Sequence, residues 1–412
     1  MPKSSKILLL AVSVVLVLTV FLGVNATGVR AATEPQDGAY RQINVYSEVL
    51  RHIQTDYVVE PNIPAVTNGA LRGLLESLDS DSSYLTPEEY KAYKADKGGK
   101  AQVGLNVSKR DGYAMVVSVV PGSPADKANL NDGDFIEAIG TQDTHDLSLA
   151  MIQRLLEGQP GSEVSIGLVR PRRGAVPEKI TMTRLNVAVP PVAETLYENS
   201  TILYLKPGAL DHEHVQQVEA KLKGMQKAGS KKILLDLRDV AAGDMDEATR
   251  LANFFLKTGT IATLEGQKFP KQTFTAESSK AVNATGPMVV IVNRGTSGPA
   301  ELVAGALLDN KRADLIGERT FGEGAQQKTF ELPDGAALIL SVAKYESPSG
   351  KKLQNEGVMP GVLVASNIAD EAEPEDDAAA VSTTPKPTVV KPAVSVDEQL
   401  TKALDLLKAK AA

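Results

Sequence analysis

Residues 288–327, MVVIVNRGTSGPAELVAGALLDNKRADLIGERTFGEGAQQ, decide the fold of this chain. Residues 288–293 form a short apolar, β-branched run that predicts a buried strand. A tight turn is expected over 294–298 and a helix over 299–308, because proline suits the first helical position and Glu301 favours the positive end. A strand, a sharp turn and a helix N-terminus can expose a nucleophile beside N–H groups that hold an oxyanion. The stretch therefore predicts the architecture of a catalytic turn.

The motifs in this stretch resemble those of the carboxyl-terminal processing (tail-specific) serine peptidases. In that family the strand ends in Asn, the turn closes on Glu, and Gly-Glu, Thr-Phe-Gly-Lys-Gly and Gln follow the helix. The matching residues in register are Asn293, Glu301, Gly317, Glu318, Thr320, Phe321, Gly322, Gly324 and Gln327. The resemblance implies a peptidase-like α/β core.

Two positions depart from the family pattern. The nucleophilic Ser of the family falls on Gly298, and its general-base Lys falls on Glu323. A Ser–Lys dyad works because a partly desolvated Lys, its pKa lowered by its surroundings, accepts the hydroxyl proton. Gly298 has no oxygen to attack with, and Glu323 carries the opposite charge. Because losing either member of such a unit costs several powers of ten in rate, the resemblance implies an inactive site.

A shifted catalytic pair stays open as an alternative. Ser297 is adjacent to the nucleophile position, and Lys328 follows Gln327, the supporting Gln of the family. The simpler interpretation makes Ser297 a turn or helix-cap residue and Lys328 a solvated strand residue. Neighbouring residues point in different directions, and a displacement of about 1 Å already harms catalysis.

Length and composition predict an α/β (α+β) multidomain protein. At 412 residues the chain is long enough for two or three domains, and its 42% apolar share is ordinary for a globular protein. It has no cysteine, which excludes disulfides and thiolate metal sites. The lysines and arginines are dispersed, so nucleic-acid binding has no support. No cofactor is expected, and no metal, since the four histidines lack a ligand set.

The N-terminus predicts export. Lys3 and Lys6 precede an uninterrupted apolar run over 7–24, and small residues follow it. Residues 1–32 are therefore expected to be a signal peptide or a membrane anchor, because a run of this length is at the threshold for spanning a bilayer. A periplasmic or cell-envelope location follows, with the cleaved and the inner-membrane-anchored forms both open.

A helical region is expected over 38–98. Apolar residues recur at helical spacing, a second helix starts near Ile63, and Thr86 precedes Pro-Glu-Glu as a helix cap. Between them, the sequence DSDSSYL over 79–85 breaks the pattern and predicts a turn.

Residues 99–185 resemble a PDZ domain. Strands are expected at 104–107, 114–120, 135–139, 163–169 and 179–184, with a helix at 148–157. The segment PGSPADKANLNDGDFIEAI over 121–139 matches the family pattern except that Asn129 replaces a Gly, and Asn tolerates a left-handed backbone. PDZ modules add a peptide to a sheet edge and hold its terminal carboxylate with backbone N–H groups. The resemblance assigns peptide binding to Val103, Gly104, Leu105, Asn106, Val107 and Leu155. A β domain that only connects its neighbours is the alternative.

The core is expected over 190–365, where strands and helices alternate as in an α/β sheet. After Asp236-Leu237-Arg238 the family has Asn-x-Gly-Gly, a loop near its active site, whereas this chain has Val-Ala-Ala-Gly over 240–243. Residues 366–395 are acidic and then Pro-rich, and predict a disordered tail. Residues 396–412 return to helical spacing and predict a helix that docks on the body or on a second subunit.

The functional hypothesis is an exported, PDZ-containing peptidase homologue that is catalytically inactive. It would bind the C-terminal ends of unfolded or short-lived envelope proteins, or a partner subunit. One alternative is a working serine-type endopeptidase that uses Ser297. Another is an adaptor that regulates an active paralogous peptidase. A homo-oligomer is compatible with each of them.

Overall fold

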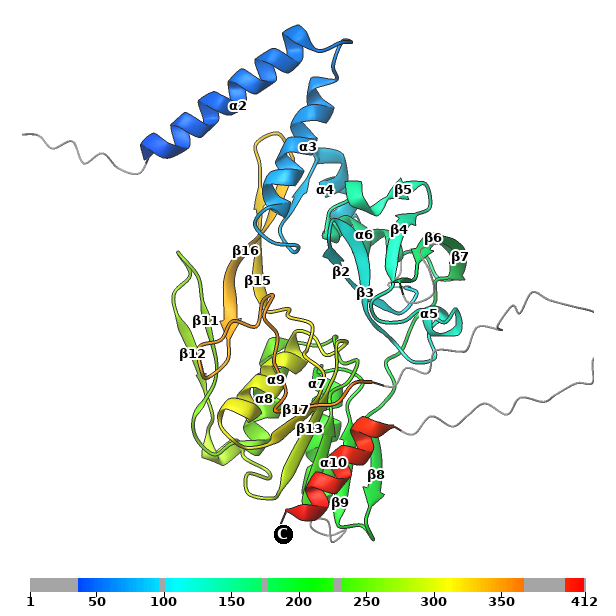
Figure 1. Ribbon diagram of the computed structural model, residues 1–412, viewed down its shortest axis with the longest axis vertical. Coiled ribbons are helices and arrows are strands. Elements are labelled where there is room, and N and C mark those ends of the chain that lie inside the picture. The colour runs from blue at the N-terminus through cyan, green and yellow to red at the C-terminus, as the bar shows by residue number, and fades with distance from the viewer. Residues whose placement is uncertain (1–35, 96–100, 172–176, 226–230, 367–396, 411–412) are drawn as a thin grey trace, which may run out of the picture. The chain divides into compact units, whose positions relative to one another are not determined.

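The computed structural model describes residues 36–95, 101–171, 177–225, 231–366 and 397–410 (Figure 1). The export segment expected over 1–32 lies outside the described residues, as does nearly all of the tail expected over 366–395. Within the described ranges, no helix has the length and apolar character needed to cross a bilayer.

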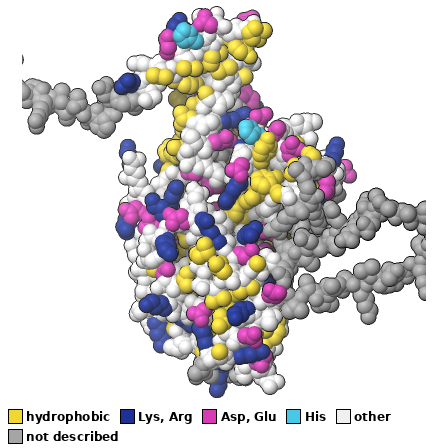
Figure 2. Space-filling model, viewed as in Figure 1, with side chains coloured by type: hydrophobic (Ala, Val, Ile, Leu, Met, Phe, Trp, Pro, Cys, Tyr) yellow, Lys and Arg dark blue, Asp and Glu magenta, His cyan; other side chains and the backbone are white. Residues whose placement is uncertain are grey.

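The chain divides into two compact units, residues 1–70 and 71–412. The first unit contains α2 (Gln36–Asp56), and the boundary falls inside α3 (Ile63–Glu76). Both are helices as predicted. Figure 2 shows apolar side chains on the surface of α2, and Tyr40, Ile43 and Val49 are more than half exposed there. The second unit holds the PDZ region and the core.

The PDZ region contains a six-stranded sheet. Five of its strands follow the order β2-β3-β4-β6-β7, and β5 pairs with β4. Its elements are β2 Leu105–Arg110, β3 Tyr113–Val119, α5 Pro124–Lys127, β4 Phe135–Ile139, β5 Gln142–Asp143, η1 Thr144–Asp146, α6 Leu149–Leu156, β6 Glu163–Val169 and β7 Glu178–Thr183. The predicted strands and helix are confirmed. Asn129 has φ +54°, so it takes the left-handed conformation that the family's Gly would supply. β2 lies at the edge of the sheet, with α6 packed beside it.

The core is built on a six-stranded sheet in the order β17-β14-β13-β10-β9-β8. All neighbours are parallel except β8 and β9. The elements of the sheet and of its helices are β8 Ala193–Tyr197, β9 Ile202–Lys206, α7 His212–Met225, β10 Lys232–Asp236, α8 Met245–Phe255, β13 Met288–Val292, α9 Pro299–Asp309, β14 Asp314–Gly317, β17 Val362–Leu363 and α10 Glu398–Ala409.

Alternate residues of these strands bury opposite faces of the sheet. Val290 and Val292 pack with α7, α8 and α9, whereas Val289 and Ile291 pack with Leu407 of α10. The C-terminal helix therefore docks on the body of its own chain, as Figure 1 shows in red. Its apolar residues cover a sheet face that would otherwise meet water.

A second sheet, β1-β16-β11-β12 with β15 paired to β16, completes the unit. Its strands are β1 Ser83–Leu85, β11 Thr260–Glu265, β12 Gln272–Thr275, β15 Ala325–Glu331 and β16 Ala337–Glu346. The turn predicted over 79–85 was wrong in its second half, because β1 gains a partner in β16 that is distant in sequence. Its first half is a turn, in which the Asp79 carboxylate accepts the N–H groups of Asp81 and Ser82.

Candidate active site

The strand, turn and helix predicted around residues 288–308 are present, and Asn293 fixes the turn. The Asn293 side-chain oxygen accepts hydrogen bonds from the backbone N–H groups of Gly295 at 3.1 Å and Asp239 at 3.0 Å. Its amide nitrogen donates to the Asp239 carboxylate at 2.7 Å. The turn after β13 is therefore held against the loop after β10.

Gly298 ends this turn in a backbone conformation that side chains rarely adopt, with φ +54° and ψ −113°. A β-carbon at this position would lie 4.0 Å from Glu323 Oε2, and no other atom beyond its chain neighbours would be as near. A strained strand-to-helix turn of this kind presents the nucleophile in other hydrolases. The backbone thus has room for a side chain facing residue 323, and the residue present has none.

Ser297, the alternative nucleophile, has no exposed surface. Its N–H donates to Val240 O at 3.0 Å, and its hydroxyl donates to Glu323 Oε2 at 2.7 Å. Lys328 lies exposed on β15 with its ammonium 5.2 Å from the centre of the Phe330 ring. Gln327 donates to the backbone oxygen of Asp81 at 2.7 Å. The structure therefore pairs Ser297 with Glu323. Lys328 instead lies over the ring of Phe330.

Glu301 is buried at the start of α9 and joins the turn to the loop that carries Glu323. Its carboxylate accepts the N–H groups of Gly298 at 2.9 Å, Gly322 at 2.8 Å and Glu323 at 2.7 Å. The Thr320 hydroxyl also donates to it. Burial raises the pKa of Glu301 to about 8, against these four donors, which favour the ionised form. Glu301 thus places residue 323 opposite Gly298.

Two further acidic residues at the site, Asp81 and Glu323, line one cavity. Burial raises the pKa of Asp81 to about 6, and the nearby charges of Glu323 and Asp79 add to the shift, against the hydrogen bond that Gln354 donates at 2.7 Å. Burial also raises the pKa of Glu323, against the Ser297 hydrogen bond.

A cavity of about 230 Å³ follows the predicted peptide groove. Of the predicted peptide-binding residues, Val103, Leu105, Asn106 and Val107 line it. Leu155 instead packs against the hydrophobic core of the PDZ region, and the next residue, Leu156, lines the cavity. Ala241 and Glu323 of the core also line it, so the groove opens beside the catalytic turn.

The loop before this groove has the features expected of a carboxylate-binding loop. Gly104 has φ +83°, and a β-carbon there would lie 2.2 Å from the Ser123 β-carbon, so the position requires glycine. Within the part of the chain that the structure describes, the N–H groups of Val103 and Gly104 donate to no acceptor. Successive free N–H groups in a turn can bind an anion.

The loop over 240–243 keeps the one glycine that its backbone needs. Gly243 has φ +138°, and its β-carbon would lie 2.5 Å from the backbone of Leu210. The two residues form a parallel bridge. The residues that replace the family's Asn and first Gly therefore leave the loop in place, and Ala241 becomes part of the groove wall.

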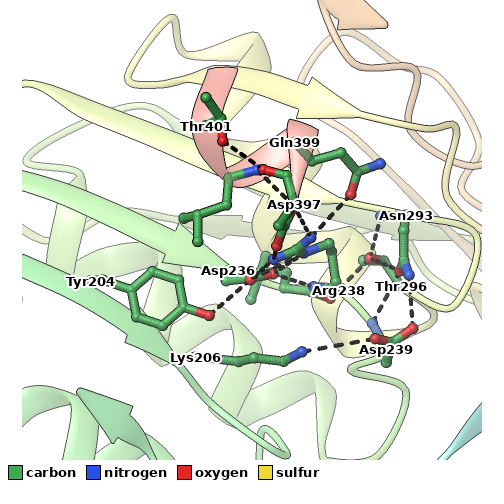
Figure 3. Close-up of polar contacts among 12 residues, drawn as sticks. Tyr204, Lys206, Asp236, Arg238, Asp239, Asn293, Thr296, Asp397, Gln399 and Thr401 are labelled. Atoms are coloured by element: carbon green, nitrogen blue, oxygen red, sulfur yellow. Dashed lines mark hydrogen bonds and ion pairs between the residues drawn. The ribbon is translucent and has the colours of Figure 1, made fainter. Parts of the chain in front are cut away.

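A polar network connects the C-terminal helix with the turn (Figure 3). Asp236 is fully buried and accepts from Tyr204 at 2.9 Å and from Arg238 at 2.6 Å. Arg238 also pairs with Asp397, the cap of α10, at 2.9 Å. The residue after Arg238 is Asp239, which binds Asn293. The position of α10 is thus coupled to the loop that supports the turn.

Sequence reasoning missed the roles of three residues. The sequence places Asp81 in a turn, and Glu301 at a helix N-terminus and within the family motif, but it does not indicate the contacts that these residues and Gln354 make. The available signal for Glu301 was an acid two residues after the sequence Ser-Gly-Pro over 297–299. The contacts of Asp81 depend on chain segments distant in sequence, which no local pattern reveals.

The fold and the site together define a class: a PDZ-containing peptidase-like protein whose peptide groove opens beside a strand-turn-helix elbow. The model of peptidase family S41 matches residues 201–364, and that of the PDZ domain matches residues 115–170. The chain is 31% identical to a carboxyl-terminal-processing protease of Synechocystis, over 88% of each chain. It is 33% identical to a carboxyl-terminal-processing protease of Picosynechococcus, over 72% of each chain.

A solved structure agrees. The photosystem II D1 C-terminal processing protease superposes with a TM-score of 0.65 at 25% identity, covering 78% of this chain and 92% of that one. The chain belongs to the carboxyl-terminal processing protease family, within peptidase family S41.

Proposed function

We propose that this chain is an exported, catalytically inactive member of its family. It binds the C-terminal ends of unfolded or short-lived envelope proteins, or of a partner subunit, in the PDZ groove and does not cut them. The observation that carries the proposal is Gly298, a residue without a side chain at the elbow where the family resemblance places the nucleophile.

Glu323 supports inactivity for a second reason. A general base must accept the proton of an attacking hydroxyl. A carboxylate can do so in principle, but the hydroxyl that Glu323 holds belongs to Ser297, which has no surface through which a peptide bond could reach it. The acid and the hydroxyl therefore form a structural pair.

Peptide binding is supported by features that remain in the groove. The edge strand β2 can accept a peptide as an added strand, and the free N–H groups of Val103 and Gly104 can hold its terminal carboxylate. Export is supported by the charged and apolar pattern of residues 1–32.

A cleavage assay tests the proposal. The native chain, Ser297→Ala and the double variant Gly298→Ser, Glu323→Lys are incubated with unstructured proteins that end in apolar residues, and the products are identified by mass spectrometry. We expect no cleavage by the native chain and cleavage by the double variant. Circular dichroism of each variant confirms that it is folded.

Two other outcomes would favour the alternatives. Cleavage by the native chain that disappears in Ser297→Ala would establish an active peptidase with a shifted nucleophile. Co-purification with an active peptidase, lost when the groove is blocked, would establish the adaptor.

A further inference from the structure

The groove cavity has an acidic character that the family resemblance does not predict. Its charged lining residues are Glu157 and Glu323, and no Lys, Arg or His belongs to the lining. Glu157 is balanced by Arg154 at 3.3 Å. Glu323 has a hydroxyl as its hydrogen-bond partner, and among the described residues no basic side chain forms an ion pair with it. The cavity therefore has an acidic side chain beside the turn, with no ion-pair partner among the described residues.

The loop before the edge strand β2, whose residue Val103 lines the same cavity, suits an anion. Among the described residues, the N–H groups of Val103 and Gly104 donate to no acceptor. A chain end that binds them brings its own carboxylate into the cavity. With an apolar last residue, that carboxylate would lie near Glu323 with no cation between them, which costs binding energy in a partly enclosed site.

We propose that the chain ends bound by this groove terminate in lysine or arginine. The inference rests on the proposed peptide-binding function and names its ligand class. The terminal carboxylate binds the N–H groups of Val103 and Gly104, and the basic head of the last side chain binds Glu323.

The apolar walls of the cavity fit a long basic side chain. Val107, Val117 and Leu156 line the cavity and provide apolar surface for the methylene groups of Lys or Arg, whose charged heads extend past such surfaces.

The preference for a basic last residue follows from Glu323, which stands where the family resemblance places the general-base lysine. A lysine at position 323 would repel a basic side chain in the groove, whereas Glu323 attracts it. The change at this position thus reverses the charge that a bound chain end meets.

Fluorescence polarisation with short labelled peptides tests this inference on the full chain. The peptides are identical except for a last residue of Lys, Arg, Leu or Glu, and one Lys peptide carries a C-terminal amide. We expect the Lys and Arg peptides to bind roughly tenfold more tightly than the Leu peptide, which corresponds to about 1.4 kcal/mol. The amide should bind more weakly than its parent acid. The preference should decline as salt rises.

Two variants locate the preference. Glu323→Gln should bring the Lys and Leu peptides to similar affinity, because it removes the charge and keeps the shape. Glu163→Gln is the matched control, since Glu163 is an exposed acid on β6 outside the cavity lining, and it should leave the preference unchanged. Thermal melting of both variants verifies that they are folded.

Failure of the inference and failure of the proposed function give different results. If the Leu peptide binds as tightly as the Lys peptide, the ligand class is wrong while peptide binding stands. If the Lys preference survives in Glu323→Gln, the assignment to Glu323 is wrong. If none of the peptides binds, the peptide-binding function itself is overturned.

Discussion

The PDZ groove and the turn after β13 differ in what a bound peptide would meet, although both are held by backbone contacts. The groove keeps an edge strand, a glycine with positive φ and free backbone N–H groups, and all of these are backbone features. The turn has a left-handed backbone conformation at residue 298, and Gly298 and Glu323 stand at the two positions where the family resemblance places a Ser–Lys pair. The backbone of this elbow does not depend on a side chain at residue 298, because Glu301 and Asn293 hold it through contacts with backbone N–H groups.

The largest effect on stability is expected from removing the Glu301 carboxylate that holds the turn. Glu301→Ala leaves the N–H groups of Gly298, Gly322 and Glu323 and the Thr320 hydroxyl without their acceptor. At about 1–3 kcal/mol for each unsatisfied group, we expect the free energy of unfolding to fall by at least about 3 kcal/mol. Urea denaturation measures it. Glu301→Gln keeps one acceptor oxygen and should lose less. An equal loss in both variants would mean that the hydrogen bonds do not hold the turn.

A smaller effect is expected from pH at the acid pair. Because the pKa of Asp81 is raised to about 6 in the folded chain, the folded state binds its proton more tightly than the unfolded state does. Stability should therefore fall as pH rises from about 4 to about 6, by about 1–3 kcal/mol. Asp81→Asn keeps an acceptor for Gln354 and removes the titration.

Denaturation midpoints of the native chain and Asp81→Asn across this pH range check the prediction. The two curves should diverge as pH rises, with the variant more stable at the upper end. Parallel curves would show that Asp81 does not titrate in this window.

The smallest effect on stability is expected in the PDZ region, at Asn129. Asn129→Ala places a β-carbon without a compensating polar group at φ +54° and should cost about 1–2 kcal/mol. Asn129→Gly should be nearly neutral, since glycine takes this conformation freely. Thermal unfolding distinguishes the two. If alanine is tolerated as well as glycine, the left-handed turn is not the reason that Asn serves there.

The sequence predicted the elements of both regions better than their contacts. The strand at 288–292 and the PDZ strands follow from apolar runs and alternation, which are local signals. The sheet that pairs β1 with β16 was missed, because a three-residue strand carries no pattern of its own and depends on a partner far along the chain. The hydrogen bond between Ser297 and Glu323 was not predicted for the same reason, although the sequence marks both residues as candidate site positions.

Reactivity at the turn tests the central claim most directly. The native chain and the double variant Gly298→Ser, Glu323→Lys are treated with a serine-reactive fluorophosphonate, and the intact proteins are weighed by mass spectrometry. The account predicts an unchanged mass for the native chain and a single adduct on the double variant. An adduct on Ser297 of the native chain would contradict it.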